Sequence, residues 1–146
     1  MDDGLRFEVV YDAPDLIQVR ISAWNGGFGG TADVYVGIES LNELAKKLNG
    51  FPRTVTDIRD VTMGDFGPRS AGGVGMKFHC VDGAGHAVVE ARIDSGDLSG
   101  QPRQSASLTI PVGASAIDSF VEELRRVGRE RAGIARLEGL PAAAHP

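Results

Sequence analysis

Two of the three histidines and the single cysteine lie close together in the sequence, as His79, Cys80 and His86. Imidazole and thiolate groups bind zinc, and a cysteine next to a histidine can also act as a nucleophile. Apolar and polar side chains alternate over residues 74–81 and again over 87–93, which predicts two strands joined by a tight turn. In such a hairpin the histidines share one face and Cys80 faces the other, so the three side chains do not converge. We therefore expect no metal site, no Cys-His catalytic pair, and a Cys80 side chain that packs in the core.

Two pairs of carboxylates have a spacing that could serve acid–base chemistry: Asp57 with Asp60, and Asp94 with Asp97. Catalysis by such a pair requires burial or a neighbouring charge that separates the two pKa values. The residues beside these aspartates supply neither, and both pairs fall in or next to predicted loops. We therefore interpret all four as solvated loop residues.

Glycine-rich loops cover residues 26–30 and 72–75. A phosphate-binding loop ends in Lys-Ser or Lys-Thr at the start of a helix, whereas these loops lead into predicted strands. The Gly-x-Ser-x-Gly motif of serine hydrolases is also missing from the sequence. These observations favour a protein that is not an enzyme and that holds no cofactor.

Large aromatic side chains flank the first glycine loop, where Trp24 precedes it and Phe28 lies within it. An aromatic at a loop tip either packs on the edge of the core or serves as an anchor for a protein partner. A second candidate surface combines acidic residues with another aromatic and consists of Asp57, Asp60, Asp65 and Phe66. These six residues are our candidates for binding a protein partner.

The most completely specified element is a helix that begins at Ser40, because Ser40 and Glu43 have the spacing of a capping box. Apolar residues then recur at i, i+3, i+4 and i+7, which places one apolar stripe on the helix. The stripe consists of Leu41, Leu44, Ala45 and Leu48. We expect Gly50 to take a left-handed conformation after the last turn, Phe51 to fold back onto the stripe, and Pro52 to prevent continuation.

Short alternating segments predict strands on both sides of this helix. They cover residues 5–11, 17–24, 32–36, 58–63, 74–81, 87–93 and 106–112. A second helix follows the last strand, with Ser115 and Asp118 as a capping pair. Its apolar stripe consists of Ile117, Phe120, Val121 and Leu124. We predict an α+β fold with one antiparallel sheet of six or seven strands and two amphipathic helices, in which residues 58–63 form an edge strand.

The two predicted helices and the strands before them align with an offset of 76 residues. Apolar positions and one glycine keep their register, so that Val34, Val36, Gly37, Leu41, Leu44 and Leu48 match Ile110, Val112, Gly113, Ile117, Phe120 and Leu124. We interpret this as the architectural pseudo-symmetry of two meander-plus-helix halves, and not as evidence of duplication.

A length of 146 residues fits one domain. We place this α+β domain at residues 1–128. Residues 129–146 are expected to form a frayed or disordered tail, because glycines and arginines interrupt the apolar pattern there.

The net charge of −5 is unevenly spread, since residues 1–124 carry 18 acidic and 10 basic side chains. An acidic body repels phosphate groups, so we expect no binding to nucleic acid. No apolar run is long enough to span a membrane. The single cysteine and the lack of a leader-like N-terminus favour a cytoplasmic location.

Most of the predicted domain carries a recognisable pattern, in the stretches Phe28–Pro52, Gly64–Gly73, Phe78–Glu90 and Ala106–Leu124. Its motifs are structural, among them the Gly-Phe-Pro helix stop and the Asp-x-x-Gly-His hairpin. In these stretches the chain resembles a group of small, uncharacterised bacterial proteins, which are similar in pattern to the WapI-type immunity proteins of polymorphic toxin systems. The resemblance implies a cytoplasmic protein without catalytic residues that binds and neutralises a toxin domain.

We therefore predict a non-enzymatic, immunity-like protein-binding module, whose acidic body would suit a basic toxin domain. The alternative is a small-ligand-binding protein or an enzyme with a pocket between the sheet and the helices. A third interpretation is self-association through an edge strand or the Trp24 loop, which would give a homo-oligomer.

Overall fold

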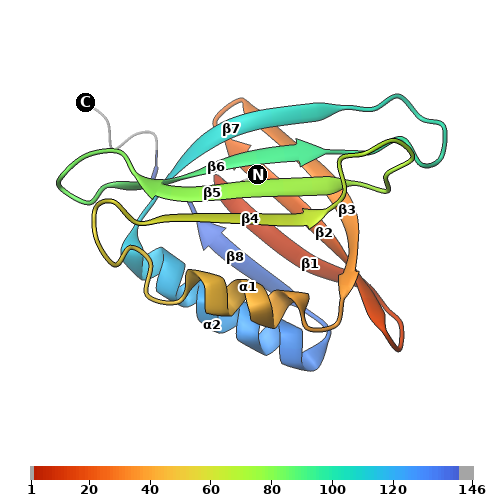
Figure 1. Cartoon of the computed structure of the whole chain (residues 1–146), viewed down its shortest axis with the longest axis horizontal. Coiled ribbons are helices and arrows are strands. Elements are labelled where there is room, and N and C mark those ends of the chain that lie inside the picture. Colours follow the sequence, from red (N-terminus) through yellow and green to blue (C-terminus); the bar gives the residue numbers. More distant parts are fainter. Residues whose placement is uncertain (1, 142–146) are drawn as a thin grey trace.

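Two four-stranded antiparallel sheets and two helices make up the protein in the computed structural model, which describes residues 2–141 (Figure 1). In chain order the elements are β1 (Gly4–Asp12), β2 (Leu16–Asn25), β3 (Phe28–Gly37), α1 (Ser40–Leu48), β4 (Ile58–Gly64), β5 (Gly73–Cys80), β6 (Ala87–Asp94), β7 (Ser105–Val112), α2 (Ala114–Glu130) and β8 (Ile134–Glu138). The predicted α+β class is confirmed. The prediction of one sheet with six or seven strands is wrong, because the chain passes through α1 after β3 and β4 begins a second sheet.

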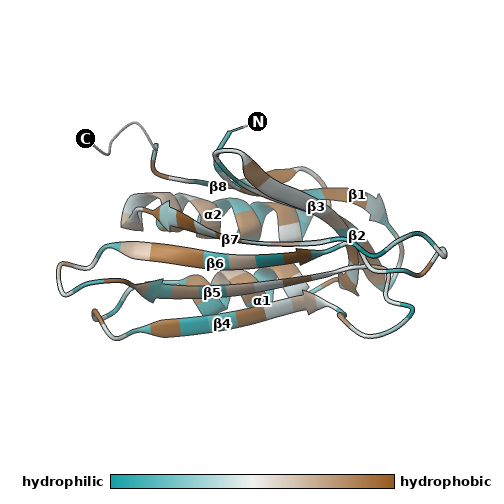
Figure 2. Ribbon diagram, turned by 90° about the horizontal axis from the view of Figure 1, so that it is seen from above, coloured by the Kyte–Doolittle hydropathy of each residue, from teal (hydrophilic) through white to brown (hydrophobic). Residues whose placement is uncertain are grey.

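The strand orders are β3-β2-β1-β8 in the first sheet and β4-β5-β6-β7 in the second. The predicted edge position of β4 is therefore confirmed. Each sheet leads directly into one helix, as β3 leads into α1 and β7 into α2. Both helices lie along the same side of the sheets (Figure 1), and hydrophobic and hydrophilic residues alternate along β4 and β5 (Figure 2). The strand-to-helix units that align in sequence thus occupy corresponding places in the topology.

The last strand, β8, was not predicted, and the expectation of a frayed tail is wrong for residues 129–141. α2 ends at Glu130, and the C-cap residue, Arg131, takes the left-handed conformation and pairs with Asp12 at 2.6 Å. The chain then runs antiparallel to β1, and Ala135 and Leu137 are completely buried. Residues 142–146, which also belong to the predicted tail, lie outside the described part of the chain.

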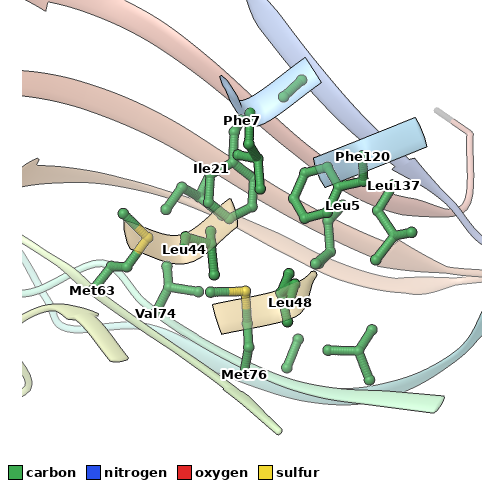
Figure 3. Packing of buried hydrophobic residues seen from close by; sticks show 14 of the residues in the cluster. Leu5, Phe7, Ile21, Leu44, Leu48, Met63, Val74, Met76, Phe120 and Leu137 are labelled. Atoms are coloured by element: carbon green, nitrogen blue, oxygen red, sulfur yellow. The ribbon is translucent and has the colours of Figure 1, made fainter. Parts of the chain in front are cut away.

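The apolar faces of both sheets and both helices meet in one core (Figure 3). All four stripe residues of α1 are buried, as are the corresponding residues of α2. Two edge-to-face aromatic pairs tie α2 and the segment after α1 to the sheets: Phe120 with Phe7, at a centroid distance of 5.4 Å, and Phe51 with Phe78, at 5.9 Å. The predicted strands and helix stripes therefore supply the core.

The helix ends follow the predictions only in part. Gly50 takes the left-handed conformation with a φ of +76°, and Phe51 is buried against the core, as expected. The predicted capping box at Ser40 is wrong, since Ser40 is already helical and the N-cap residue is Glu39, which makes no side-chain cap. α2 likewise begins directly after Gly113, so Ser115 lies in its first turn. Within residues 2–141, neither helix is both long enough and apolar enough to cross a membrane.

Candidate functional site

The hairpin that carries the histidines has the predicted turn, since Val81 N donates to His86 O at 2.9 Å. The side chains diverge: His79 Nε2 lies 2.8 Å from Glu90 Oε2, and His86 Nδ1 lies 2.6 Å from an oxygen of Asp82. Within residues 2–141, no three His, Cys, Asp or Glu side chains come close enough to hold a metal ion. The cysteine before the turn is half-buried and not a full core residue as predicted, because β5 ends there.

The indole of Trp24 packs on its own sheet. Trp24 pairs with Gly29 across β2 and β3, and a Cβ atom on Gly29 would overlap the indole ring. Trp24 Nε1 is buried without a hydrogen-bond partner among the described residues. The ring forms one wall of a groove of about 650 Å³ on the outer face of the sheet, together with Arg6 and Arg136. Trp24 is therefore half-buried and held mainly by apolar packing.

Phe28 is the most exposed large hydrophobic residue of the described chain, with 75% of its surface accessible. It follows a two-residue turn whose first residue, Gly26, has a φ of +64°. The hairpin is held from both sides, because Asn25 donates to the carbonyl of Thr109 on β7 and Gly26 N donates to Asp3 Oδ1 at 2.9 Å. Phe28 is thus presented to solvent on a fixed hairpin, on the face opposite to Trp24.

The candidate Asp57 is engaged within the fold. Its carboxylate accepts hydrogen bonds from Arg53 N at 2.8 Å and from the Arg59 guanidinium at 2.8 Å and 3.2 Å. Arg59 also donates to the carbonyls of Lys47, in the last turn of α1, and of Asn49, its C-cap residue, at 3.0 Å and 2.8 Å. Asp57 and Arg59 therefore satisfy the C-terminal end of α1 and have little capacity left for a partner.

Protonation of Asp57 is expected to destabilise the protein. The hydrogen bond from Arg59 is the main reason that the pKa of Asp57 lies below its ordinary value. A depressed folded-state pKa stabilises the fold fully above the unfolded-state pKa of about 4, and this contribution is lost as the pH falls through the folded-state pKa. In urea unfolding at about pH 6 and about pH 3, the wild type should lose more stability than Asp57→Asn. Equal losses in the two proteins would show that Asp57 contributes nothing to the acid sensitivity.

Asp60 is exposed and makes no ion pair or side-chain hydrogen bond with any residue that the structure describes. It lines a groove of about 410 Å³ between β4 and α1. The helix contributes Glu43, Leu44 and Lys47 to this groove. Asp60 is therefore free to meet a partner beside a surface that is partly apolar and partly charged.

The candidates Asp65 and Phe66 shape the loop after β4. Asp65 Oδ1 accepts a hydrogen bond from Gly67 N at 3.0 Å, which closes a tight turn. The Phe66 ring lies over Gly75 of β5, and the guanidinium of Arg92 covers it at 4.3 Å from the ring centroid. Both residues thus hold the loop onto the outer face of the second sheet.

A neighbouring loop, residues 95–104, is joined to this one through Arg103. Its guanidinium donates to the carbonyl of Phe66 at 2.7 Å, to that of Gly67 at 2.5 Å, and to Asp97 at 3.2 Å. Asp94 is 1% exposed and accepts a hydrogen bond from Gly96 N at 2.8 Å. The interpretation of Asp94 as a solvated residue is wrong, because the two loops fold over it.

The sequence did not predict a groove that lies along the free edge of β3. It has a volume of about 550 Å³ and lies between β3 and the 95–104 loop. Tyr35 and Leu98 line it and are 48% and 62% exposed. The alternating pattern of β3 could have marked Tyr35 as outward-facing, whereas only the tertiary structure brings Leu98 next to it.

The six predicted partner-binding residues do not form one site. Trp24 and Phe28 belong to the β2–β3 hairpin, which contacts β7, whereas the other four lie in or beside β4 at the opposite edge of the second sheet. Of the six, Phe28 and Asp60 are both exposed and free of internal side-chain bonds among the described residues. No family model matches the chain, and neither a curated protein nor a solved structure matches it.

Proposed function

We propose that this chain is a cytoplasmic, non-enzymatic protein-binding module that neutralises a toxin domain by binding to it, in the manner of an immunity protein. The observation that carries the proposal is the exposure of Phe28 on a hairpin that is fixed at both sides. A rigid, exposed aromatic loses little conformational entropy on binding and buries a large apolar area, which is typical of an interface anchor.

The charge of the chain supports a basic partner. The excess of positive charge after residue 124 is largely used inside the fold: Arg125 pairs with Glu122 at 2.7 Å, and Arg131 pairs with Asp12 at 2.6 Å. Arg126 donates to the carbonyl of Ile134 at 3.1 Å. The acidic residues of the body are therefore not balanced by a separate basic tail in the described part of the chain, and complementary charge would speed association with a basic toxin domain.

The alternative of a ligand pocket between the sheets and the helices receives less support. Buried side chains from both sheets and both helices occupy that space. The grooves at Trp24, at Tyr35 and Leu98, and between α1 and β4 all open to the outside of the protein. Such grooves suit contact with another macromolecule better than enclosure of a small ligand.

Replacing Phe28 by alanine is expected to weaken the complex with a toxin domain encoded beside the gene by about 30-fold, since a central aromatic anchor contributes about 2 kcal/mol. Titration calorimetry of the purified pair measures this, and co-expression measures protection of the host. Tyr11→Ala is the matched control, because Tyr11 is also exposed, at 57%, but lies at the far end of β1. A protein that neither binds nor protects against any neighbouring toxin would disprove the proposed function.

A further inference from the structure

The two helices run beside two equivalent edge strands, α2 beside β8 and α1 beside β4 (Figure 1). The registers of the two sheets make Thr62 of β4 the counterpart of Arg136 of β8, since Met63 and Leu137 are buried at the next position of each strand. The same comparison makes Asp60 the counterpart of Ile134. The backbone groups of Asp60 and Thr62 on β4 therefore correspond to those of Ile134 and Arg136 on β8.

The edge of β8 is closed by side chains of α2. Hydrogen bonds from Gly139 N to Asp3 O and from Val9 N to Gly133 O show that odd-numbered residues of this segment face β1. The backbone groups of Ile134 and Arg136 consequently point to the free edge. There, Arg136 N donates to Glu123 Oε1 at 2.7 Å.

A second side chain completes this closure, because Arg126 donates to the carbonyl of Ile134 at 3.1 Å. Two of the outward-facing backbone groups of β8, the carbonyl of Ile134 and the N–H of Arg136, are thus satisfied by α2. A protected edge of this kind cannot accept another strand without losing these bonds.

The edge of β4 lacks both bonds. Asp65 N donates to Gly72 O at 3.0 Å, which places the odd-numbered residues of β4 against β5 and leaves Asp60 and Thr62 facing outward. Neither the carbonyl of Asp60 nor the N–H of Thr62 has a hydrogen-bond partner among residues 2–141. β4 therefore presents a donor and an acceptor with the spacing of an unpaired strand.

The sequence explains the difference between the two edges. The 76-residue offset aligns Lys47 with Glu123 and Gly50 with Arg126. An ammonium group cannot accept the Thr62 N–H, and a glycine has no side chain to reach a carbonyl. The two hydrogen bonds that α2 makes to the edge of β8 therefore have no equivalent between α1 and β4.

We propose that β4 binds an extended, basic segment of the partner protein as an added strand, an inference that rests on the proposed binding function. The free backbone groups face the groove of about 410 Å³ between β4 and α1, which has room beside the strand. Its acidic residues, Glu43 and Asp60, have no ion-pair partners among the described residues and lie on either side of the groove. They outnumber the one basic residue that lines the groove, Lys47, and favour lysine or arginine on the added strand.

The test uses the full chain labelled with ¹⁵N and the hexapeptide Lys-Val-Lys-Val-Lys-Val, observed by nuclear magnetic resonance. Binding as an added strand should shift the amide signals of residues 58–64 and slow the hydrogen exchange of the Thr62 amide. The same peptide N-methylated at every residue has the same side chains but has no N–H on either edge with which to pair, and it should leave these signals unchanged. Absence of the shift at millimolar peptide, or an equal shift with the methylated peptide, would overturn the proposal.

Lys47→Glu separates strand pairing from simple charge attraction. By analogy with Glu123, the new carboxylate can accept the Thr62 N–H and close the edge, so we expect peptide affinity to fall about tenfold. Attraction of a basic peptide to an acidic surface predicts the opposite, because the substitution adds negative charge. Lys46→Glu is the matched control, since Lys46 is exposed and does not line the groove. Tighter binding by both variants would refute strand pairing.

Thr62→Pro provides a second variant, because proline removes the outward N–H and is tolerated on an edge strand. It should abolish the shift, whereas Thr62→Val keeps the N–H and should preserve it. Signals of β4 that move with protein concentration and not with peptide would overturn the inference in favour of pairing between copies. A toxin domain that binds wild type, Lys47→Glu and Thr62→Pro equally would remove this inference and leave the proposed function intact.

Discussion

Leu44→Asp is expected to unfold the protein. Leu44 is 3% exposed and occupies the centre of the apolar stripe of α1, where it packs between the two sheets with Ile21 and Met63 nearby (Figure 3). On its buried side, Leu44 belongs to the cluster of apolar side chains that forms the core. Burying an unpaired charge there should cost about 4–5 kcal/mol or more, which is comparable to the whole stability of many small domains.

Circular dichroism and urea unfolding measure the effect, with Lys46→Asp as the control. Lys46 is exposed on the opposite side of the same helix, so the same new side chain remains hydrated and should change the stability by less than about 1 kcal/mol. Equal tolerance of the two substitutions would contradict the placement of α1 against the core.

Gly72→Ala is expected to cause the second largest loss of stability. Gly72 is buried where the loop after β4 meets the edge of β3, and its φ is +151°. A Cβ atom at this position would overlap the carbonyl oxygen of Asp33, which belongs to the backbone of β3 and cannot rotate away. Backbone strain and overpacking together should cost about 3 kcal/mol.

The hydrogen bonds around Gly72 add to this effect. Its N–H donates to Ser70 Oγ at 3.0 Å, and its carbonyl accepts from Asp65 N at 3.0 Å, so a shift of the backbone would disturb the loop as well. Thermal and urea unfolding measure the loss. Gly83→Ala is the matched control, because a Cβ atom on Gly83 meets nothing within 4 Å. If both alanine variants were equally stable, the close approach between the loop and β3 would be disproved.

Local patterns in the sequence predicted the strands and helix stripes well. Alternation marked the buried positions Phe7, Ile21 and Val34, and the i, i+3, i+4, i+7 spacing marked the buried face of each helix. These signals succeed because the side-chain direction repeats with a fixed period in each type of element. Helix starts were predicted less well, since a serine one residue too late in the chain looks the same in sequence as a true cap.

The last strand illustrates a different reason for failure. Residues 134–138 are short and follow a segment rich in arginine and glycine, so a local pattern favours a tail. β8 forms because β1, near the other end of the chain, offers an unpaired edge, and because Ala135 and Leu137 can then join the core. This stabilisation of β8 comes from tertiary contacts, and a short stretch of sequence does not reveal it.

The candidate binding residues were chosen from residue type, and the structure separates those that are free from those that are used. Asp57 and Asp60 are the same type of residue, as are Phe66 and Phe28. In the structure, however, Arg59 binds Asp57 and Arg92 covers the ring of Phe66. Arg92 comes from β6, a different segment of the chain, and Arg59 reaches Asp57 from only two residues further along the chain. Exposure and hydrogen bonding thus decided which candidates remain available.

By itself, the sequence determined the α+β class, the main strands, the apolar faces of both helices and their 76-residue correspondence. Only the tertiary structure decided that the strands divide into two sheets, that β8 completes the first, and that the edge of β4 stays open while that of β8 is closed. The physical reason is that periodic burial is written in neighbouring residues, whereas strand order and the pairing of edge groups depend on contacts between residues distant in the chain.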